Sequence, residues 1–229
     1  MNVKIVSVTK SLIEEKELTP EELIVYIARV SNPSNQLNSE TAAKLLRYLI
    51  KNKHWSPFEQ VDICFEIKTS RAIAQQILRH WSFSFQEFSQ RYSEVTEIEP
   101  TQLRQQADKN RQSSTIPINP KFFIGGSIDN ASNHIKTFIN YSLLLYKKLI
   151  ENGVAKEVAR MILPLTTQTT IYMKGNVRDW LAYLNVRLPE TVQKEHRDIA
   201  FEIANKITTL FPVITEATEN FNNFSGNFM

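Results

Sequence analysis

Residues 79–92, with the sequence RHWSFSFQEFSQRY, combine cationic, acidic and aromatic side chains in one short segment. Two arginines, a histidine, a glutamate and three serines alternate here with five aromatic rings. Guanidinium groups grip phosphate through paired hydrogen bonds, and aromatic rings stack on flat molecules. We therefore expect the segment to line a pocket for a flat, anionic ligand. The alternative is an amphipathic surface helix that carries incidental charges.

The order of residues in this segment resembles the signature of the flavin-dependent thymidylate synthases. In that signature, Arg-His-Arg is followed at a fixed interval by Ser, with Glu before this Ser and Arg-Tyr close behind it. Trp81 stands where the family usually has its second arginine, so the chain departs from the pattern at this position. The residues that match are Arg79, His80, Glu87, Ser89, Arg91 and Tyr92.

Three further elements resemble the same family, so the resemblance covers roughly residues 28–195. Residues 54–59 are similar to its His-x-[Ser/Thr]-Pro-Phe-Glu element, which approaches the flavin. Residues 153–160, followed by Leu-Pro, resemble a second element that ends in a substrate-binding arginine. Residues 176–187 resemble a third, which contains Asn-x-Arg and a later arginine. Thr191 stands where family members commonly have a histidine.

The resemblance implies a role for particular residues of each element. Arg187 is implied to be catalytic and to act on the pyrimidine, and Arg160 to bind substrate from another subunit. The residues implied to bind dUMP are Gln76, Arg79, Glu87, Ser89, Gln90, Arg91, Arg160 and Arg187. The residues implied to bind FAD are His54, Ser56, Arg79, His80, Trp81, Glu87, Asn176, Val177, Arg178 and Ala182.

The reaction implied by the family is the methylation of dUMP to dTMP. Methylenetetrahydrofolate would donate the carbon, FAD would carry the hydride and NADPH would reduce the FAD. The family resemblance also implies a homotetramer with shared active sites, because each site borrows residues from more than one subunit. Arg187 would favour negative charge on the uracil ring, which is an electrostatic role.

No side chain of the enzyme needs to act as a nucleophile in this chemistry. Ser89 is a poor candidate, because a serine needs an adjacent base and the sequence supplies none specifically. Cys64 lies in the middle of an expected strand, between Asp62 and Glu66, whose carboxylates disfavour a thiolate. We interpret this cysteine as structural.

The composition is that of an ordinary globular protein of 229 residues, 42% hydrophobic and 22% charged. The net charge of +3 favours an anionic partner without identifying one. One cysteine excludes an internal disulfide and fits a reducing cytoplasm, and no apolar run is long enough to span a bilayer.

With 5 glycines and no Gly-x-Gly-x-x-Gly loop, a flavin or nucleotide must be held by side chains. The histidines lack metal-ligand spacing, so we expect no metal site.

Hydrophobic periodicity predicts an α+β chain that is rich in helices, and the resemblance implies the small, mostly antiparallel sheet of the flavin-dependent thymidylate synthase fold. We expect a single catalytic domain over residues 1–219 and a frayed tail over 220–229. Strands are expected over residues 2–9, 61–67 and 166–173. Helices are expected over residues 20–30, 39–50, 70–80, 129–152, 154–163, 176–188 and 189–210.

The signature is expected at the end of the helix over residues 70–80, where Gln76, Arg79 and His80 would share one face. Helical spacing assigns Phe85 and Phe88 to the core, whereas Trp81 could stack on a ligand or be buried. Residues 100–123 are polar and contain three prolines, which predicts a long excursion or lid with little regular structure.

Two other functions stay open. The chain could be a basic nucleic-acid-binding module that uses aromatic stacking, although Glu94, Glu97 and Glu99 follow the arginines closely and argue against a basic face. It could also be a flavin-poor homologue that binds nucleotide without turnover, because Trp81 replaces a guanidinium. We favour the enzyme, with small-molecule substrates and with neither nucleic acid nor membrane as a partner.

Overall fold

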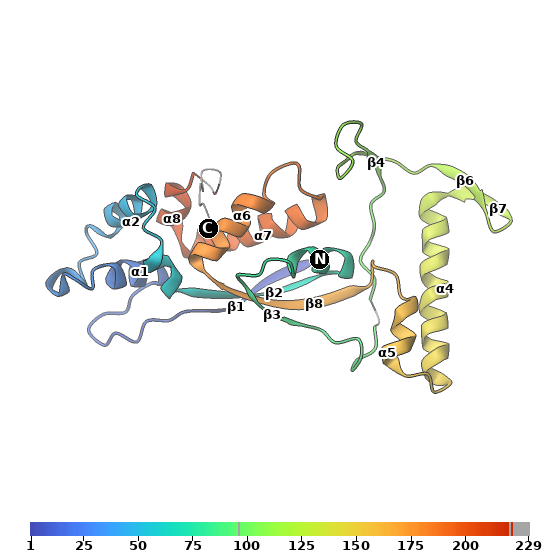
Figure 1. The fold of residues 1–229 in the computed structure, drawn as a ribbon, viewed down its shortest axis with the longest axis horizontal. Coiled ribbons are helices and arrows are strands. Elements are labelled where there is room, and N and C mark those ends of the chain that lie inside the picture. The colour runs from blue at the N-terminus through green and yellow to red at the C-terminus, as the bar shows by residue number, and fades with distance from the viewer. Residues whose placement is uncertain (96, 220, 222–229) are drawn as a thin grey trace. The chain divides into compact units, whose positions relative to one another are not determined.

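The computed structural model describes residues 1–95, 97–219 and 221 (Figure 1). The chain divides into two compact units. Unit 1 consists of Met1, Lys68–Gln76 and Glu87–Thr170, and unit 2 of Asn2–Ile67, Ile77–Gln86 and Ile171–Met229. The expectation of one catalytic domain over residues 1–219 stays a prediction. The expected tail over 220–229 lies, apart from residue 221, outside the described residues.

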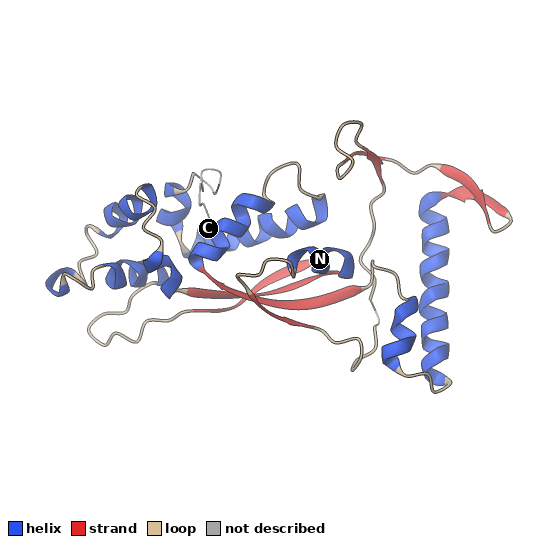
Figure 2. Ribbon diagram, in the orientation of Figure 1, coloured by secondary structure: helices blue, strands red, loops and turns tan. Residues whose placement is uncertain are grey.

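A four-stranded sheet has the order β1-β2-β8-β3, formed by Asn2–Val8, Asp62–Ser70, Gln168–Asn176 and Ser84–Glu87. The backbone N–H of Val177 donates to the carbonyl of Val61 at 2.9 Å, and that of Arg71 to Thr167 at 2.9 Å. Because the residue numbers rise along one strand as they fall along the other, β2 and β8 run antiparallel. More of the described residues lie in helices than in strands. Figure 2 shows both kinds of element, and the expected helix-rich α+β fold with a small antiparallel sheet is confirmed.

Strand β2 illustrates why these residues form a sheet. Its side chains alternate between buried and half-buried, and Ile63, Phe65 and Ile67 are fully buried. Alternation with period two places the apolar side chains on one face of a strand. The alternation read from the sequence therefore corresponds to the observed strand.

The helices of unit 2 are α1 (Pro20–Ala28), α2 (Ala42–Lys51), α6 (Val177–Arg187), α7 (Lys194–Leu210) and α8 (Pro212–Ala217), with short 3₁₀ turns η1 (Pro33–Asn35) and η2 (Ser56–Gln60). Thr19 caps α1 in a capping box, since its side chain accepts from the backbone N–H of Glu22 and the Glu22 carboxylate accepts from the backbone N–H of Thr19. The core centres on Trp180 of α6, whose ring lies 4.6 Å from that of Phe83 and 4.8 Å from that of Phe65.

Unit 1 contains α3 (Arg71–Ile77), α4 (Ala131–Glu151), α5 (Lys156–Ala159) and the 3₁₀ turn η3 (Arg160–Ile162). Helix α4 ends before Gly153, as expected, and this glycine has a positive φ of 85°.

The expectation of little regular structure over residues 100–123 was wrong. Two antiparallel hairpins begin there, with strands β4 (Arg104–Gln106), β5 (Ser114–Pro117), β6 (Lys121–Ile124) and β7 (Ser127–Asn130).

The second hairpin has a sequence signal that a prediction could have used. Gly125 and Gly126 form its two-residue loop and have φ values of 60° and 87°. Such loops need positive φ at both positions, which glycine adopts without steric cost. A Gly-Gly pair between two short apolar runs therefore favours a hairpin.

The signature segment also differs from the expectation. Helix α3 ends at Ile77, so Arg79 and His80 follow the helix and do not extend its face with Gln76. Strand β3 comes next, and the helical spacing that assigned Phe85 and Phe88 to the core does not apply. Phe85 is half-buried and Phe88 is 36% exposed.

Candidate active site

Two of the family-like elements meet in unit 2. Arg178, in the first turn of α6, forms an ion pair with Glu59 of η2, 119 residues earlier in the chain. The backbone N–H of Val177 donates to the carbonyl of Val61 at 2.9 Å, next to this pair. The third element, with its Asn-Val-Arg sequence, is thus held against the element over residues 54–59.

Asn176 has a structural task at the start of α6. Its side-chain oxygen accepts from the backbone N–H of Asp179 at 3.0 Å, and the Asp179 carboxylate accepts from the backbone N–H of Asn176 at 3.3 Å. This capping box satisfies N–H groups that the helix cannot pair internally. It fixes where α6 starts, and therefore where Val177, which is buried, and Arg178 lie.

Arg187, at the last position of α6, contacts the signature directly. Its Nε–H donates to Nε2 of His80 at 2.9 Å, across 107 residues of sequence. The pKa of His80 is lowered to about 4 by burial, and further by the positive charges of Arg187 and Arg79. The structure therefore gathers three of the predicted residues, Arg79, His80 and Arg187, into one cationic cluster with a neutral imidazole.

The remaining residues predicted to bind FAD lie at or near the surface of unit 2. His54 and Ser56 are exposed, and the His54 ring meets the ring of Tyr48 edge-on at 6.0 Å. Ala182 is half-buried on α6. Trp81 is 89% exposed. Of the two interpretations of this indole, burial in the core of the unit is therefore wrong.

In unit 1, the carboxylate of Glu87 is held by two residues that the sequence did not suggest. The hydroxyl of Thr169 donates to Oε1 of Glu87 at 3.0 Å, and Nη1 of Arg71 donates to the same oxygen at 3.2 Å. These contacts fix one carboxylate oxygen and leave the other available for a ligand, as far as the described residues are concerned. Gln76 is half-buried on α3.

A cavity of about 410 Å³ lies between the end of the signature and α5. Ser89 begins a tight turn, because its carbonyl accepts from the backbone N–H groups of Tyr92 at 3.1 Å and Ser93 at 3.0 Å. This turn and the first residues of α5 form the walls of the cavity. The lining residues are Ser89, Arg91, Tyr92, Ala155, Lys156 and Glu157.

The cations at this cavity are paired with carboxylates. Nη2 of Arg91 lies 3.0 Å from Oε2 of Glu157, and the Nε–H of Arg160 donates to the backbone carbonyl of Glu157 at 3.3 Å. Lys156 pairs with Glu94 at 3.4 Å. Arg91 and Arg160, which are both implied to bind dUMP, thus contact a single acidic residue.

Gln90, between the two lining residues Ser89 and Arg91, is only 4% exposed. Its Nε2 finds no hydrogen-bond acceptor within the part of the chain that the structure describes. A buried amide left in this way costs about 1–3 kcal/mol. This cost is offset if an acceptor from a ligand or another chain meets the amide.

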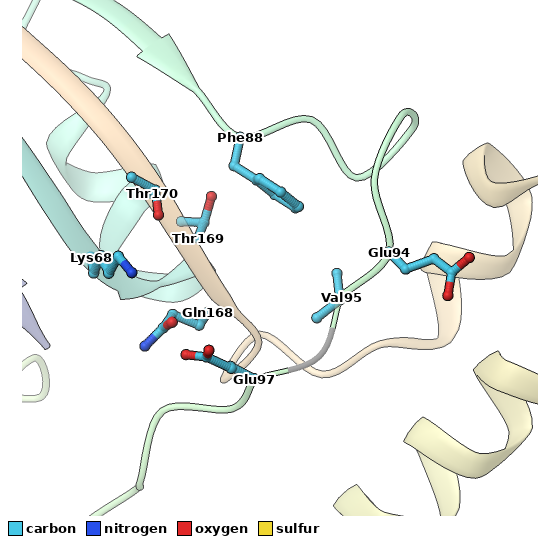
Figure 3. Close-up of a pocket in the computed structure, with 8 residues that line it drawn as sticks. All are labelled: Lys68, Phe88, Glu94, Val95, Glu97, Gln168, Thr169 and Thr170. Atoms are coloured by element: carbon cyan, nitrogen blue, oxygen red, sulfur yellow. The ribbon is translucent and has the colours of Figure 1, made fainter.

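A second, smaller cavity of about 170 Å³ lies beside β8 (Figure 3). It contains none of the predicted site residues, and its two carboxylates make it unsuited to a phosphate. The lining residues are Lys68, Phe88, Glu94, Val95, Glu97, Gln168, Thr169 and Thr170.

Three further observations concern other kinds of site. Burial raises the pKa of the Cys64 thiol, which disfavours a thiolate, although the cause is burial and not the neighbouring acids. Within residues 1–95, 97–219 and 221, no three His, Cys, Asp or Glu side chains are grouped as metal ligands would be. In the same residues, no helix has the length and apolar character needed to cross a bilayer.

Sequence reasoning missed several residues of these sites. Lys156 and Glu157 lie inside a family-like element, so their place beside Arg160 was a usable signal. Tyr183 precedes Arg187 by one helical turn on α6, which is also a usable spacing. Arg71, Thr169 and His196 gave no signal of this kind.

Comparison with known proteins gives a consistent result. The Thymidylate synthase complementing protein family matches residues 11–213. A probable flavin-dependent thymidylate synthase of Paramecium bursaria Chlorella virus 1 is 48% identical over 96% of this chain and 99% of its own length. The flavin-dependent thymidylate synthase of Synechocystis sp. is 44% identical, over 96% of this chain and its entire length.

A solved structure supports the same fold. It is the UMP/dUMP methylase PolB from Streptomyces cacaoi bound with 5-Br dUMP, which aligns with a TM-score of 0.77 and 25% identity. The alignment covers 98% of this chain and 97% of that protein. The matched family, the two relatives and the shared fold agree with the signature residues, and the chain is therefore an enzyme of the flavin-dependent thymidylate synthase family.

Proposed function

We propose that this enzyme methylates dUMP reductively to dTMP. Methylenetetrahydrofolate donates the carbon, FAD carries the hydride and NADPH is the reductant. The observation that carries the proposal is the cationic cluster in which Arg187 and Arg79 surround the neutral His80. The names of the viral and cyanobacterial relatives support thymidylate synthesis, and the bound 5-Br dUMP of the Streptomyces neighbour supports a uridylate substrate.

The donor set of unit 2 fits FAD. A dinucleotide cofactor offers a diphosphate, which suits guanidinium groups, and a flat ring, which suits exposed aromatic side chains. We assign Arg79, Arg178 and the start of α6 to the cofactor phosphates, and His54, His80 and Trp81 to its flat surfaces. The ion pair with Glu59 holds the Arg178 side chain in place. Ser56, Glu87, Asn176, Val177 and Ala182 complete the proposed FAD set.

The donor set of unit 1 fits the phosphate of dUMP. Ser89 and Arg91 line the larger cavity, and the unpaired amide of the buried Gln90 lies between them in the chain. We assign these residues and Arg160 to the phosphate, in a cage of charge-assisted hydrogen bonds. The proposed dUMP set also contains Gln76 and Glu87 of unit 1 and, from unit 2, Arg79 and Arg187. The second carboxylate oxygen of Glu87 would orient the nucleotide.

Arg187 is the proposed catalytic residue. Negative charge on the uracil favours attack from its C5=C6 bond on the methylene donor, and a guanidinium beside the ring stabilises that charge. When bound, FAD supplies the hydride that completes the methyl group, after reduction by NADPH. Tyr183 and His196, behind His80, are buried and keep bulk water from this side of the cluster.

The same assignment requires no covalent bond between enzyme and nucleotide. Ser89 is exposed, and among the described residues no side chain forms a hydrogen bond with its hydroxyl, so no base is in place to activate it. Burial raises the pKa of Cys64, which disfavours the thiolate. Both residues therefore stay outside the proposed chemistry.

We extend the proposal to assembly and location. The family assignment supports a homotetramer with shared active sites, and the amide nitrogen of Gln90, which has no acceptor among the described residues, is compatible with a partner chain nearby. The single cysteine supports a cytoplasmic location. Sedimentation of the purified protein at several concentrations measures the assembly state.

Absorbance spectroscopy tests the function most directly. The purified protein should be yellow, and NADPH should bleach it under anaerobic conditions, faster when dUMP is present. Addition of methylenetetrahydrofolate should then yield dTMP. The matched control omits only the folate, and it should give bleaching without dTMP.

The two rival functions predict different results. A colourless protein that takes up no added FAD but still binds dUMP would indicate a flavin-poor homologue. Binding of single strands with a steep salt dependence, and without flavin, would indicate a nucleic-acid module.

A further inference from the structure

The hydrogen bond between Arg187 and His80 fixes the tautomer of the histidine. A guanidinium has only donors, so Nε2 of His80 must accept the Nε–H of Arg187 over the distance of 2.9 Å. The proton of the neutral ring must therefore lie on Nδ1. A protonated ring would offer two donors and would break this contact.

A buried pair lies behind the histidine and holds its ring. Tyr183 packs against His80 edge-on, with 4.9 Å between the ring centroids. The Tyr183 hydroxyl shares a hydrogen bond of 3.0 Å with Nε2 of His196, whose ring centroid lies 6.3 Å from that of His80. Tyr183 and His196 are both essentially inaccessible to solvent. Because Tyr183 and Arg187 are one turn apart on α6, one helix face carries both contacts to His80.

Charge decides what kind of acceptor suits Arg187. The charged groups that face His80 are Arg79 and Arg187, and its ionisable neighbours Tyr183 and His196 are kept neutral by burial. Burial and these two cations also keep His80 neutral, with a pKa of about 4. A carboxylate in the same place would accept the same hydrogen bond but would cancel the guanidinium charge.

We propose that His80 is a positioning residue, a neutral acceptor that fixes the plane of the Arg187 guanidinium and leaves its whole charge for the pyrimidine. The contact uses Nε, and among the described residues neither terminal nitrogen of Arg187 has a hydrogen-bond partner. The hydrogen bonds of both terminal nitrogens are therefore left for a ligand, and together they form a fork that can meet two ring atoms of a uracil.

This inference rests on the proposed function only in what it says about catalysis, because the tautomer of His80 can be measured without turnover. The chain has 4 histidines, so ¹⁵N-histidine NMR of the intact protein gives few ring signals. His80, assigned by loss of its signals in His80→Gln, should show a protonated Nδ1 and a bare Nε2. It should stay neutral from pH 8 down to pH 5. A ring with Nε2 protonated, or one that titrates within this range, would overturn the proposal.

Three substitutions separate positioning from a simple structural role. His80→Leu removes the acceptor and should lower kcat at saturating dUMP and FAD by about 10- to 100-fold, the usual effect of losing a hydrogen bond to a charged group. His80→Gln keeps a neutral acceptor near Nε2 and should recover most of this loss. His80→Glu keeps an acceptor but adds a negative charge. It should therefore orient Arg187, but its kcat should stay low.

Coupling to Arg187 completes the test. If His80 acts through the guanidinium, adding His80→Leu to Arg187→Lys should lower kcat much less than His80→Leu lowers it alone. Circular dichroism confirms that each variant is folded. Equal defects in the Leu and Gln variants, or full additivity with Arg187→Lys, would refute the positioning role. A wild-type protein that makes no dTMP but shows the expected tautomer would instead refute the proposed function.

Discussion

Arg91 and Glu157 form an ion pair at the larger cavity of unit 1, with 3.0 Å between Nη2 and Oε2. Both side chains are mostly exposed, at 67% and 54%. Exposed pairs of this kind contribute little to stability, so an incoming dianion can replace the carboxylate at low cost. Glu157 thus holds the arginine in the cavity and, under the proposed function, also competes with the substrate phosphate.

Removing this competitor should strengthen nucleotide binding. We expect Glu157→Gln to lower the Kd for dUMP by about 1.5- to 5-fold, the range of an exposed ion pair. Isothermal titration calorimetry measures the change. The matched control is Glu151→Gln, which breaks an exposed pair with Lys148 on α4, 2.8 Å in length, and should leave the Kd as it is. Weaker binding by Glu157→Gln would mean that the carboxylate orients Arg91 productively.

Ser89 should matter for binding more than for chemistry. Ser89 lines the cavity proposed for the phosphate, and among the described residues no side chain forms a hydrogen bond with its hydroxyl as an activating base would. We expect Ser89→Ala to raise the KM for dUMP by about 5- to 10-fold, as for one lost hydrogen bond, with kcat within about 2-fold. Steady-state kinetics separate these parameters. A complete loss of turnover at saturating dUMP would reopen the question of a serine nucleophile.

Arg187 should be needed for methylation and not for flavin binding. Arg187→Ala removes the charge that we propose for the pyrimidine, and we expect dTMP formation to stop while the protein stays yellow. Arg187→Lys keeps a charge without the planar fork and should retain only a small part of the activity. Flavin absorbance and dTMP formation are measured on the same preparation. Turnover near the wild-type rate in Arg187→Ala would disprove the assignment.

Gly175 should tolerate no side chain, because Phe83 of the signature lies too close. A Cβ added at Gly175 would lie 2.5 Å and 2.6 Å from two ring atoms of Phe83. Overpacking of this kind costs about 1–3 kcal/mol, so Gly175→Ala should shift the urea midpoint of unfolding downward. Adding Phe83→Leu should recover part of the loss by making room. An unchanged midpoint in Gly175→Ala would show that the ring moves freely.

Histidine burial should make stability fall in mild acid. The pKa of His196 is lowered to about 3 and that of His80 to about 4, in both cases mainly by burial, from an ordinary value of 6.5. Below pH 6.5 the unfolded chain therefore binds protons that the folded chain does not. The contribution of the two neutral histidines to the free energy of unfolding is fully present above pH 6.5. It is lost as the pH falls toward 4, by up to about 1.4 kcal/mol per pH unit for each group.

Urea unfolding between pH 8 and pH 4.5 checks this pH dependence. His196→Gln cannot take up the proton, so its stability should be lower at pH 8 but should fall less steeply below pH 6.5. An equally steep fall in this variant would assign the acid sensitivity to other groups.

Local patterns along the chain determined much of the fold. The alternation of β2, the Thr19–Glu22 capping box and the glycine after α4 are each set by interactions within a few residues. Such interactions are the same in an isolated segment and in the folded protein, so the sequence reveals them. The signature likewise indicates the family, because it depends only on residue types and on their spacing along the chain.

Long-range packing decided the rest. Residues 84–87 carry a helix-compatible pattern, yet they form β3 because β8 offers an unpaired strand edge beside them. Arg187 meets His80 across 107 residues, and Arg178 meets Glu59 across 119. No local rule relates residues so far apart, because their contact exists only once both segments have packed against the same core. The sequence by itself determined the family and the locally set elements such as α1 and β2, and the tertiary structure decided that residues 84–87 form a strand and which charged side chains became partners.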